Sequence, residues 1–315
     1  MKVTDLSIAI PSWNTRDLLD QCLASLKQSI DGLSCEVLVV DNASTDGSAE
    51  MVEAGHKDVI LLRNRMNLGF AAACNTAFKH STGRYFCLLN SDTIVLKDSL
   101  KPLVEFMDSH PDAGAVGCKL LNHDGSLQRS CSCFPSLMTE LFDALYLSKL
   151  FPRNRVFGCY SMSYWDFGET REVDFVGGSC MMVRREAIEE VGLLDESYFM
   201  YTEEADWCYR MWDSGWKVYY YPGAQIIHLG GQSARKYGGD IRLYLYLSRN
   251  KFIRKYRGRV AAALHRGIII AGAIGRLAVY GARRLVGSKG FNDSAFQYLL
   301  LRWAVRGITA WEAGP

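Results

Sequence analysis

Short apolar runs alternate with stretches of helical periodicity along the first 120 residues of the chain. The runs have the length of buried strands, roughly four to eight residues. We predict five such strands, at 6–11, 36–40, 59–62, 85–89 and 115–118. Helices are predicted between the strands, at 17–29, 71–80 and 99–109. Strand–helix alternation at this spacing predicts an α/β domain with a parallel sheet and right-handed crossovers.

The pattern changes in the second part of the chain. Residues 122–172 combine prolines and many aromatic residues without a clear period, so we expect irregular structure over the edge of the sheet. The elements predicted beyond them are ordered structure at 173–184, a helix at 203–214, strands at 217–221 and 225–228, and helices after Gly239. These boundaries predict a main domain over 1–240, with halves at 1–120 and 121–240, and a helical tail over 241–315.

The charges divide the chain at about the same place. Residues 241–315 hold 14 of the 36 Lys and Arg but only two of the 34 Asp and Glu, although the net charge of the whole chain is just +2. A basic segment of this kind favours an anionic partner. Because Leu and Ile are interleaved with the bases, the tail has the composition of helices that lie on an anionic bilayer surface. The alternative is a helical cap or an oligomer contact, such as a homodimer interface, whose bases are merely solvated.

Composition and cysteine spacing exclude several protein classes. With 49% hydrophobic and 22% charged residues, the chain is neither disordered nor collagen-like. Its ten cysteines are scattered without a CxxC pair, which favours reduced thiols in a cytosolic protein. The N-terminus has one Lys and an apolar run over 6–10 only, which predicts a strand and not a secretory leader. The longest apolar stretch, 267–275, is shorter than the roughly 20 residues of a membrane crossing, so no full crossing is expected.

Polar side chains follow three of the predicted strands. They are Asn14, the cluster 41–46 and the cluster 90–92. In parallel sheets the ligand crevice lies beyond the carboxyl ends of the strands, so these clusters should meet in one place. Asp41 could accept hydrogen bonds from a base or a ribose, and Asp92 suits a divalent cation shared with a diphosphate. For each cluster an ordinary turn or helix cap is the alternative.

Two further groups lie in the second half of the main domain. Glu203, Glu204 and Asp206 are three acids within four residues at a predicted helix start. They either complement the helix dipole, or one of them is a general base whose pKa is raised by crowding. His228 leaves a strand into a glycine-rich loop, where it is either a metal ligand or a structural imidazole.

The sequence lacks the motifs of several common enzyme classes. No GxGxxG follows a predicted strand, and neither GxxxxGK[ST] nor GxSxG occurs. These absences disfavour a dinucleotide dehydrogenase, a P-loop enzyme and a serine hydrolase. The tail matches no motif that reads nucleic acid, so no nucleic-acid partner is expected.

In order and spacing, these groups resemble the family 2 glycosyltransferases, inverting enzymes of the GT-A fold. The resemblance covers about residues 6–233 and is carried by IAIPSWN, VLVVDNASTDGS, NRMNLGFAAACN, LLNSD and the segment from FVGGSCMMVRREAIEEVGLLDESYFMYTEEADWCYR to GWKVYYYPGAQIIH. DGSLQRSCSCFPS and FMYTEEADW are similar to bacterial rhamnosyltransferases of cell-wall or O-antigen glycans, although hexosyltransferases of the family share much of these motifs. The resemblance implies a Rossmann-like, mostly parallel central sheet flanked by helices, with a helical C-terminal extension.

Carried over by position, the resemblance assigns roles to individual residues. The implied nucleotide-site residues are Pro11, Asn14, Asp41, Asn42, Ser44, Asn67, Gly69, Asn75, Asn90 and Ser91. Asp41 would bind a pyrimidine ring. Asp92 would hold Mg²⁺ or Mn²⁺ with the help of His228, and Asn90 stands where the DxD-like motif of the family has its first acid.

The same comparison implies the residues that act on the sugars. Glu204 occupies the position of the family's catalytic aspartate, with Glu203 or Asp206 as alternative bases. The residues implied near the donor and acceptor sugars are Gly177, Gly178 and Trp207.

The implied activity is metal-dependent inverting transfer of a sugar in cell-surface polysaccharide synthesis. The preferred reaction moves L-rhamnose from dTDP-rhamnose to a glycan or a polyprenyl-diphosphate-linked acceptor. The alternatives are a hexosyltransferase that uses a UDP-sugar and a catalytically weak scaffold that binds nucleotide sugars. A nucleotidyltransferase is disfavoured because residues 6–16 contain no glycine for a phosphate loop. The expected location is the cytoplasm, with peripheral attachment to the inner face of the cell membrane.

Overall fold

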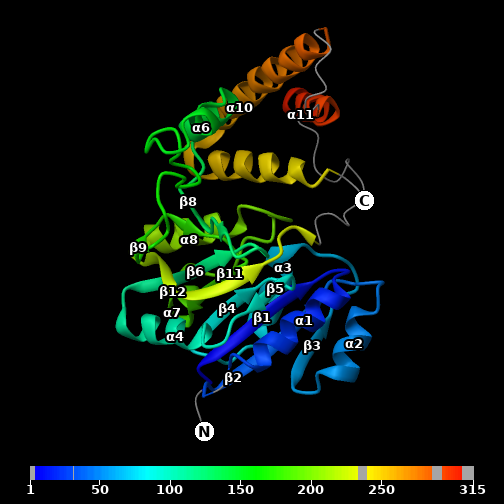
Figure 1. Ribbon diagram of the computed structural model, residues 1–315, viewed down its shortest axis with the longest axis vertical. Coiled ribbons are helices and arrows are strands. Elements are labelled where there is room, and N and C mark those ends of the chain that lie inside the picture. Colours follow the sequence, from blue (N-terminus) through cyan, green and yellow to red (C-terminus); the bar gives the residue numbers. More distant parts are fainter. Residues whose placement is uncertain (1–3, 31, 233–239, 286–292, 307–315) are drawn as a thin grey trace. The chain divides into compact units, whose positions relative to one another are not determined.

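The computed structural model describes residues 4–30, 32–232, 240–285 and 293–306. The chain forms two compact units (Figure 1). The sheet unit comprises Met1–Phe134 and Asp166–Lys236, and the helical unit comprises Pro135–Trp165 and Tyr237–Pro315. The helical unit therefore contains more than the predicted tail, because residues 135–165 cluster with it.

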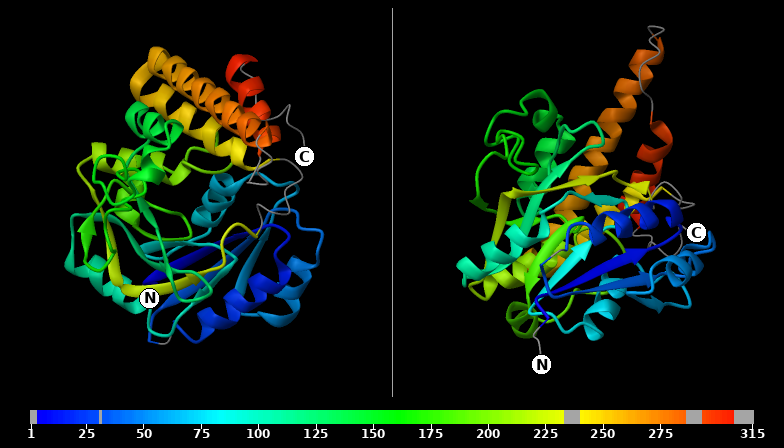
Figure 2. Two further views of the ribbon diagram at one scale, coloured as in Figure 1. Left: turned by 45° about the horizontal axis from the view of Figure 1, so that its top comes forward. Right: turned by 60° about the horizontal axis from the view of Figure 1, so that its bottom comes forward.

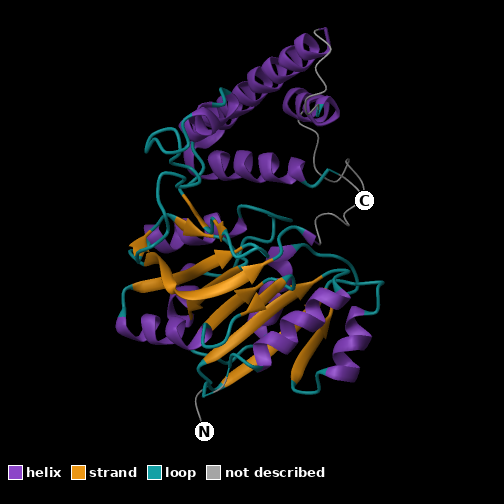
Figure 3. Cartoon of the chain, in the orientation of Figure 1, coloured by secondary structure: helices purple, strands orange, loops and turns teal. Residues whose placement is uncertain are grey.

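The sheet unit is built on a mixed β-sheet, whose strands are orange in Figure 3. Its main path runs β3-β2-β1-β4-β11-β6-β12-β5. The bounds are β1 (Leu6–Ser12), β2 (Cys35–Asp41), β3 (Val59–Arg63), β4 (Tyr85–Leu89), β5 (Thr93–Val95), β6 (Ala113–Leu121), β11 (Cys180–Arg184) and β12 (Lys217–His228). The short strands are β7 (Leu127–Gln128), β8 (Cys131–Ser132), β9 (Arg171–Glu172) and β10 (Phe175–Val176).

Strand direction confirms the parallel prediction for one half of the sheet and corrects it for the other. β1 is parallel to β2 and β4, and β2 is parallel to β3. β11 is antiparallel to both β4 and β6, between which it lies. The strands predicted from strand–helix alternation correspond to β1–β4 and β6. Of these, β1–β4 pair with one another in parallel, and β6 is parallel to β12.

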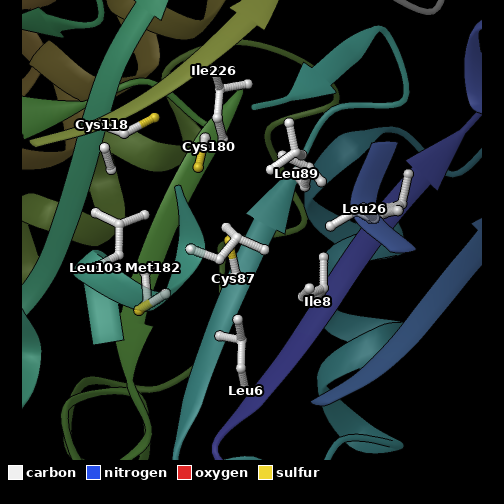
Figure 4. Packing of buried hydrophobic residues seen from close by; sticks show 14 of the residues in the cluster. Leu6, Ile8, Leu26, Cys87, Leu89, Leu103, Cys118, Cys180, Met182 and Ile226 are labelled. Atoms are coloured by element: carbon white, nitrogen blue, oxygen red, sulfur yellow. The ribbon is translucent and has the colours of Figure 1, made fainter. Parts of the chain in front are cut away.

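In the described part of the sheet unit, six helices flank this sheet. They are α1 (Arg16–Lys27), α2 (Ser48–Gly55), α3 (Phe70–Lys79), α4 (Leu100–Ser109), α7 (Arg185–Val191) and α8 (Glu203–Asp213). One core cluster joins α1, α2 and α4 to a single face of the sheet, and α3 packs against β1 and β2. Ile8, Cys87 and Cys180 are fully or almost fully buried in this core (Figure 4). All ten cysteines are free thiols.

The helical unit corrects the prediction of irregular structure over 122–172. It contains α5 (Leu137–Ala144) and α6 (Leu147–Leu150), and α5 begins with a capping box formed by Ser136 and Thr139. The tail is helical as predicted wherever it is described, in α10 (Arg242–Leu285) and α11 (Ser294–Arg306). Gly258 breaks α10 at φ 84°, a left-handed conformation that favours glycine, so α10 consists of two arms (Figure 2).

Two kinds of contact hold the helical unit together. Leu243, Ile269, Phe296, Leu300 and Trp303 form an apolar cluster between α10 and α11. Arg249 and Arg276 of α10 pair with Glu140 and Asp143 of α5. Among the described residues, Arg242–Arg283 has the length and the apolar composition of a membrane-crossing helix. The prediction that the chain does not fully cross a membrane was based only on the uninterrupted apolar run at 267–275, and it stays a prediction.

Candidate active site

The loops that follow β1, β2 and β4 are hydrogen-bonded to one another. Asn14 accepts a hydrogen bond at Oδ1 from the backbone N–H of Thr45, at 2.8 Å, and donates its own N–H to Oγ of Ser44, at 2.9 Å. The hydroxyls of Thr15 and Ser91 lie 2.9 Å apart. The polar clusters after these three strands therefore meet at one edge of the sheet, as the strand-end rule predicts. Pro11 lies just before this edge, paired with Val40.

Asp41 presents one unsatisfied oxygen at the end of β2. The side chain is almost completely buried, and Oδ2 accepts a hydrogen bond from the N–H of Ser44 at 3.1 Å. Oδ1 is also buried and has no hydrogen-bond partner among the described residues. A buried carboxylate oxygen without a donor is costly, so a ligand N–H at this position would be stabilising.

A loop over 64–69 joins this edge to the chain before α8. Asn42 donates from Nδ2 to the carbonyl of Gly69 at 3.2 Å, and Asn67 accepts at Oδ1 from the N–H of Gly69 at 3.0 Å. Gly69 has φ 84°, and a Cβ atom there would lie 2.4 Å from the carbonyl oxygen of Phe199. Phe70 donates its N–H to the same carbonyl at 3.0 Å. Glycine is therefore required where the two segments meet.

Asp92 and His228 lie side by side beyond β4 and β12. Oδ1 of Asp92 is 3.2 Å from Nε2 of His228, and Nδ2 of Asn90 is also 3.2 Å from that nitrogen. Burial alone would raise the pKa of the Asp92 carboxyl, but the hydrogen bond and the charge of His228 outweigh it and hold the pKa below its usual range. Asp92 is therefore an anion at neutral pH.

Gln128 determines which nitrogen of His228 carries a proton. Its Nε2 donates to the carbonyl of His228 at 3.1 Å and to Oδ1 of Asn122 at 2.9 Å, so its Oε1 is left as an acceptor. That oxygen lies 2.6 Å from Nδ1 of His228, which must be the protonated nitrogen. Nε2 then faces the Asp92 anion: it pairs with Asp92 when it carries a second proton, and its lone pair can share a cation with Asp92 when it does not.

These residues fit a divalent cation that is shared with a diphosphate. Adjacent ligands of an octahedral ion with bonds of about 2.1 Å lie about 3 Å apart, close to the Asp92–His228 separation. Among the described residues, no group of three or more His, Cys, Asp or Glu side chains could hold a metal on its own. Mg²⁺ and Mn²⁺ commonly take one or two protein ligands and fill the other positions with phosphate oxygens and water. The loop after His228 is described as far as Gln232, and Ser233 lies outside the described residues.

Glu203 and Glu204 begin α8 immediately after a strained turn. Tyr201 and Thr202 both have positive φ, at 67° and 72°, a conformation that costs energy in residues other than glycine. Oε2 of each glutamate is buried without a hydrogen-bond partner among the described residues. Cys74 of α3 is close enough to both carboxylates for their charges to contribute to its raised pKa, after burial.

The two glutamates differ in burial. Glu203 is buried, whereas Glu204 remains partly exposed. Burial and then the Glu204 charge raise the pKa of Glu203 well above its usual range. Burial raises the pKa of Glu204 to about 7. The pKa of Glu204 is therefore raised as predicted. The main cause is burial, however, and not the crowding by neighbouring acids that the sequence suggested.

The segment 177–179 contacts Asn90, which lies beside Asp92 and His228, on one side and α3 on the other. Ser179 accepts at its carbonyl the N–H of Asn90, at 3.0 Å. A Cβ atom on Gly178 would approach the ring of Phe70 to 3.1 Å, and Gly177 donates its N–H to the carbonyl of Ser130 at 2.8 Å. Gly177 and Gly178 thus lie near both Asn90 and the α3 segment that contacts Phe199.

Three predicted site residues have structural contacts instead. Asn75 donates from Nδ2 to the carbonyl of Leu194 and to Oε1 of Glu196, and it accepts at Oδ1 the N–H of Leu194, so both of its amide hydrogens and its oxygen are taken up. Asp206 is fully buried and paired with Arg210, with 3.0 Å between Oδ2 and Nε. Trp207 is buried and donates its indole N–H to the carbonyl of Gly192 at 2.8 Å. We therefore withdraw Asn75 from the nucleotide site, Asp206 as a base, and Trp207 as a sugar contact.

Comparison with known proteins agrees with this geometry. The model of glycosyl transferase family 2 matches residues 7–192. The chain belongs to this family. It is 32% identical over 234 residues, 71% of this chain and 75% of the relative, to the N-acetylglucosaminyl-diphospho-decaprenol L-rhamnosyltransferase of Mycobacterium tuberculosis. It is 25% identical over 254 residues, 79% of this chain and 75% of the relative, to the low-salt glycan biosynthesis hexosyltransferase Agl10 of Haloferax volcanii.

Solved glycosyltransferases share the fold. The mannosyltransferase PcManGT of Pyrobaculum calidifontis, in complex with GDP-Man and Mn²⁺, superposes with a TM-score of 0.53 at 18% identity, over 100% of this chain and 89% of that one. S. aureus TarS 1–349 with UDP-GlcNAc gives a TM-score of 0.54 at 15% identity, over 96% and 72%. Such neighbours establish a GT-A type fold for this family 2 glycosyltransferase.

Proposed function

We propose that this glycosyltransferase transfers L-rhamnose from dTDP-rhamnose, with inversion and with the help of Mg²⁺ or Mn²⁺, to a polyprenyl-diphosphate-linked glycan. The observation that carries the transfer step is Glu204, a partly exposed residue whose carboxylate has a buried, unpartnered oxygen and a pKa of about 7. The rhamnosyl donor and the lipid-linked acceptor are inferred from the name of the mycobacterial relative.

The donor base would bind at Asp41. Thymine and uracil both carry an N3–H, which suits the buried Oδ1 that lacks a donor. Asn14 and Ser44 shape the turn next to it. This contact does not distinguish the two bases, so the choice of dTDP over UDP follows from the proposed rhamnosyl transfer and not from Asp41.

The diphosphate would lie at Asp92 and His228. A divalent cation bound there supplies positive charge to the leaving nucleoside diphosphate. Asp92 contributes an anionic oxygen, and Gln128 keeps the Nε2 lone pair of His228 directed at the same point. Asn90 in place of a second carboxylate leaves this site with one negative charge, so its affinity for the metal depends on the diphosphate.

The acceptor hydroxyl would lose its proton to Glu204. A base with a pKa of about 7 is half deprotonated at neutral pH and still accepts a proton readily. Burial and the Glu204 charge raise the pKa of the neighbouring Glu203 well above its usual range, which disfavours a second negative charge at this site. One displacement by the activated hydroxyl on the face opposite the leaving group inverts the anomeric carbon.

A lipid-linked acceptor would require the enzyme to work at a membrane. The 14 bases and two acids of residues 241–315 favour the inner, anionic face of the cell membrane over a homodimer contact. We therefore propose a cytoplasmic enzyme that is peripherally attached.

A direct test combines donor binding with turnover. We expect dTDP-rhamnose with Mn²⁺ to raise the melting temperature and UDP-hexoses to raise it less, because ligands that bind only the folded state stabilise it. Glu204→Gln should keep this shift and lose at least ~100-fold in rate. A larger shift with UDP-hexoses would favour a hexosyltransferase like the Haloferax relative, and full function of Glu204→Gln would favour a binding scaffold.

A further inference from the structure

Eight consecutive residues of the helical unit, 149–156, are all exposed. This segment, KLFPRNRV, is called the tip here. Leu150, Phe151 and Val156 are 67%, 52% and 58% exposed. Its charged side chains are Lys149, Arg153 and Arg155, and it contains no acid. Soluble proteins seldom gather large apolar side chains on the surface unless the patch binds something.

The tip has a defined conformation. Asn154 accepts at Oδ1 the N–H of Val156, at 2.8 Å, and Gly158 donates its N–H to the carbonyl of Asn154, also at 2.8 Å. Phe157 packs edge-on against the buried Phe142 of α5, with 5.1 Å between ring centroids. One aromatic residue thus anchors the loop inward, while its neighbours are directed into solvent.

The acids of the helical unit do not offset the charge of the tip. The unit contains 17 Lys and Arg but five Asp and Glu in sequence. The four acids in its described residues all pair with arginines of the same unit, as Glu140–Arg249, Asp143–Arg276, Asp240–Arg242 and Asp293–Arg242. None of these four acids therefore pairs with Lys149, Arg153 or Arg155 of the tip.

We propose that the tip docks the enzyme on an anionic lipid bilayer. Leu150 and Phe151 would enter the boundary of the acyl chains, while the long side chains of Lys149, Arg153 and Arg155 reach the headgroup phosphates. A second copy of the chain is a poorer occupant, because it presents the same bases and its described acids in this unit are already paired. The inference rests on the membrane association in the proposed function and locates it in a segment outside the basic tail.

Vesicle co-sedimentation of the full-length protein tests the docking surface. We expect binding to vesicles of phosphatidylglycerol with phosphatidylcholine, and much weaker binding to phosphatidylcholine alone. At about 1 kcal/mol per base near the surface, Arg153→Gln with Arg155→Gln should lower the partition coefficient ~30-fold at low salt. Leu150→Ser with Phe151→Ser should lower it at least ~10-fold, with little dependence on salt.

Matched variants separate the tip from the tail and from a loss of folding. Val260→Ser with Leu264→Ser changes two exposed apolar residues of α10 and should leave binding unchanged. Arg153→Lys with Arg155→Lys keeps the charge and should restore binding. The proposal would be overturned if the tip variants bound vesicles as well as the unchanged protein. It would also be overturned if only the α10 variant lost vesicle binding. A dimer in solution that the tip variants dissociate would overturn it as well.

Binding is measured without donor or acceptor, so the two proposals fail separately. A protein that binds vesicles but transfers no rhamnose contradicts the proposed function alone. A protein that transfers sugar to its acceptor but does not bind anionic vesicles contradicts the docking surface and the peripheral attachment, and leaves the proposed transfer reaction intact.

Discussion

Gln128 holds Nδ1 of His228 at 2.6 Å from its Oε1, while Nε2 of the same ring faces Asp92 at 3.2 Å. Nδ1 thereby carries a proton, so the neutral form of the ring presents the Nε2 lone pair next to a carboxylate. In metal sites, such outer partners typically change metal affinity or activity by about 10- to 100-fold when they are removed.

Gln128→Leu should therefore weaken the apparent affinity for Mn²⁺ by ~10-fold or more, because His228 loses the acceptor that fixes its tautomer. The measurement is the initial rate of sugar transfer as a function of Mn²⁺ concentration. Gln128→Glu keeps an acceptor oxygen and should retain most of the affinity. An unchanged Mn²⁺ dependence in the Leu variant would show that His228 does not contribute to the metal site.

The rate should depend on the protonation of Glu204. Its pKa is raised to about 7, and a general base works only when it is deprotonated, so kcat/KM should rise with pH through about 7. Below that value the rate should fall about tenfold per pH unit. Rates at saturating Mn²⁺ across this range provide the measurement. A midpoint near 4.5, the ordinary value for a glutamate, would mean that another group limits the reaction.

The close contact between Gly69 and Phe199 predicts a sharp effect on stability. Gly69→Ala forces a Cβ atom to 2.4 Å from a backbone oxygen at φ 84°, so it should lower the free energy of unfolding by about 2 kcal/mol or more. Chemical denaturation followed by circular dichroism measures the change. Gly55→Ala is a suitable control because nothing lies within 4 Å of its Cβ position, and it should leave stability equal or slightly higher. If the two substitutions changed the free energy of unfolding equally, the 64–69 loop would have to move away from Phe199 at no cost.

The parts of the site that follow from local sequence were predictable. Asp41 ends the buried strand β2 and Asp92 follows the buried strand β4, and the geometry of parallel strands brings such ends to one edge whatever the rest of the fold is. The parallel strands β1 to β4 were predictable for the same reason, because apolar runs alternate with helical periods there.

The remainder depends on contacts between segments that are distant in sequence. Gln128 reaches His228 across 100 positions, and a glutamine in a two-residue strand gives no local signal. Trp207 and Asn75 are polar or aromatic residues next to a motif, and only packing shows that Gly192 and Leu194 take up their hydrogen bonds. α2 and β5 were also missed, since each is short and adjoins a polar turn.

The buried pair of Glu140 and Arg249 predicts how the helical unit responds to substitution and to acid. Oε1 of Glu140 lies 3.0 Å from Nη1 of Arg249, and Oε2 lies 3.3 Å from Nε2 of the buried His265. Burial alone would raise the pKa of Glu140, but its interactions with Arg249 and with the nearby His265 ring outweigh burial and lower the pKa. The folded pKa is thus below the unfolded one, so the stabilisation is present above the unfolded pKa and is lost as pH falls through the folded one.

Glu140→Ala should accordingly cost about 3 kcal/mol or more, because it leaves Arg249 buried without its partner. Denaturant unfolding of this variant, followed by circular dichroism at neutral and acidic pH, gives the size of the loss and its pH dependence. Asp240→Ala removes a partner of the exposed Arg242 and should cost no more than about 1 kcal/mol. The two variants should differ less in their loss of unfolding free energy at acidic pH, because Glu140 of the unchanged protein becomes protonated there. If the two cost the same at neutral pH, α5 would not be held to α10 by this pair, and the apolar cluster around Leu300 would have to hold the unit together.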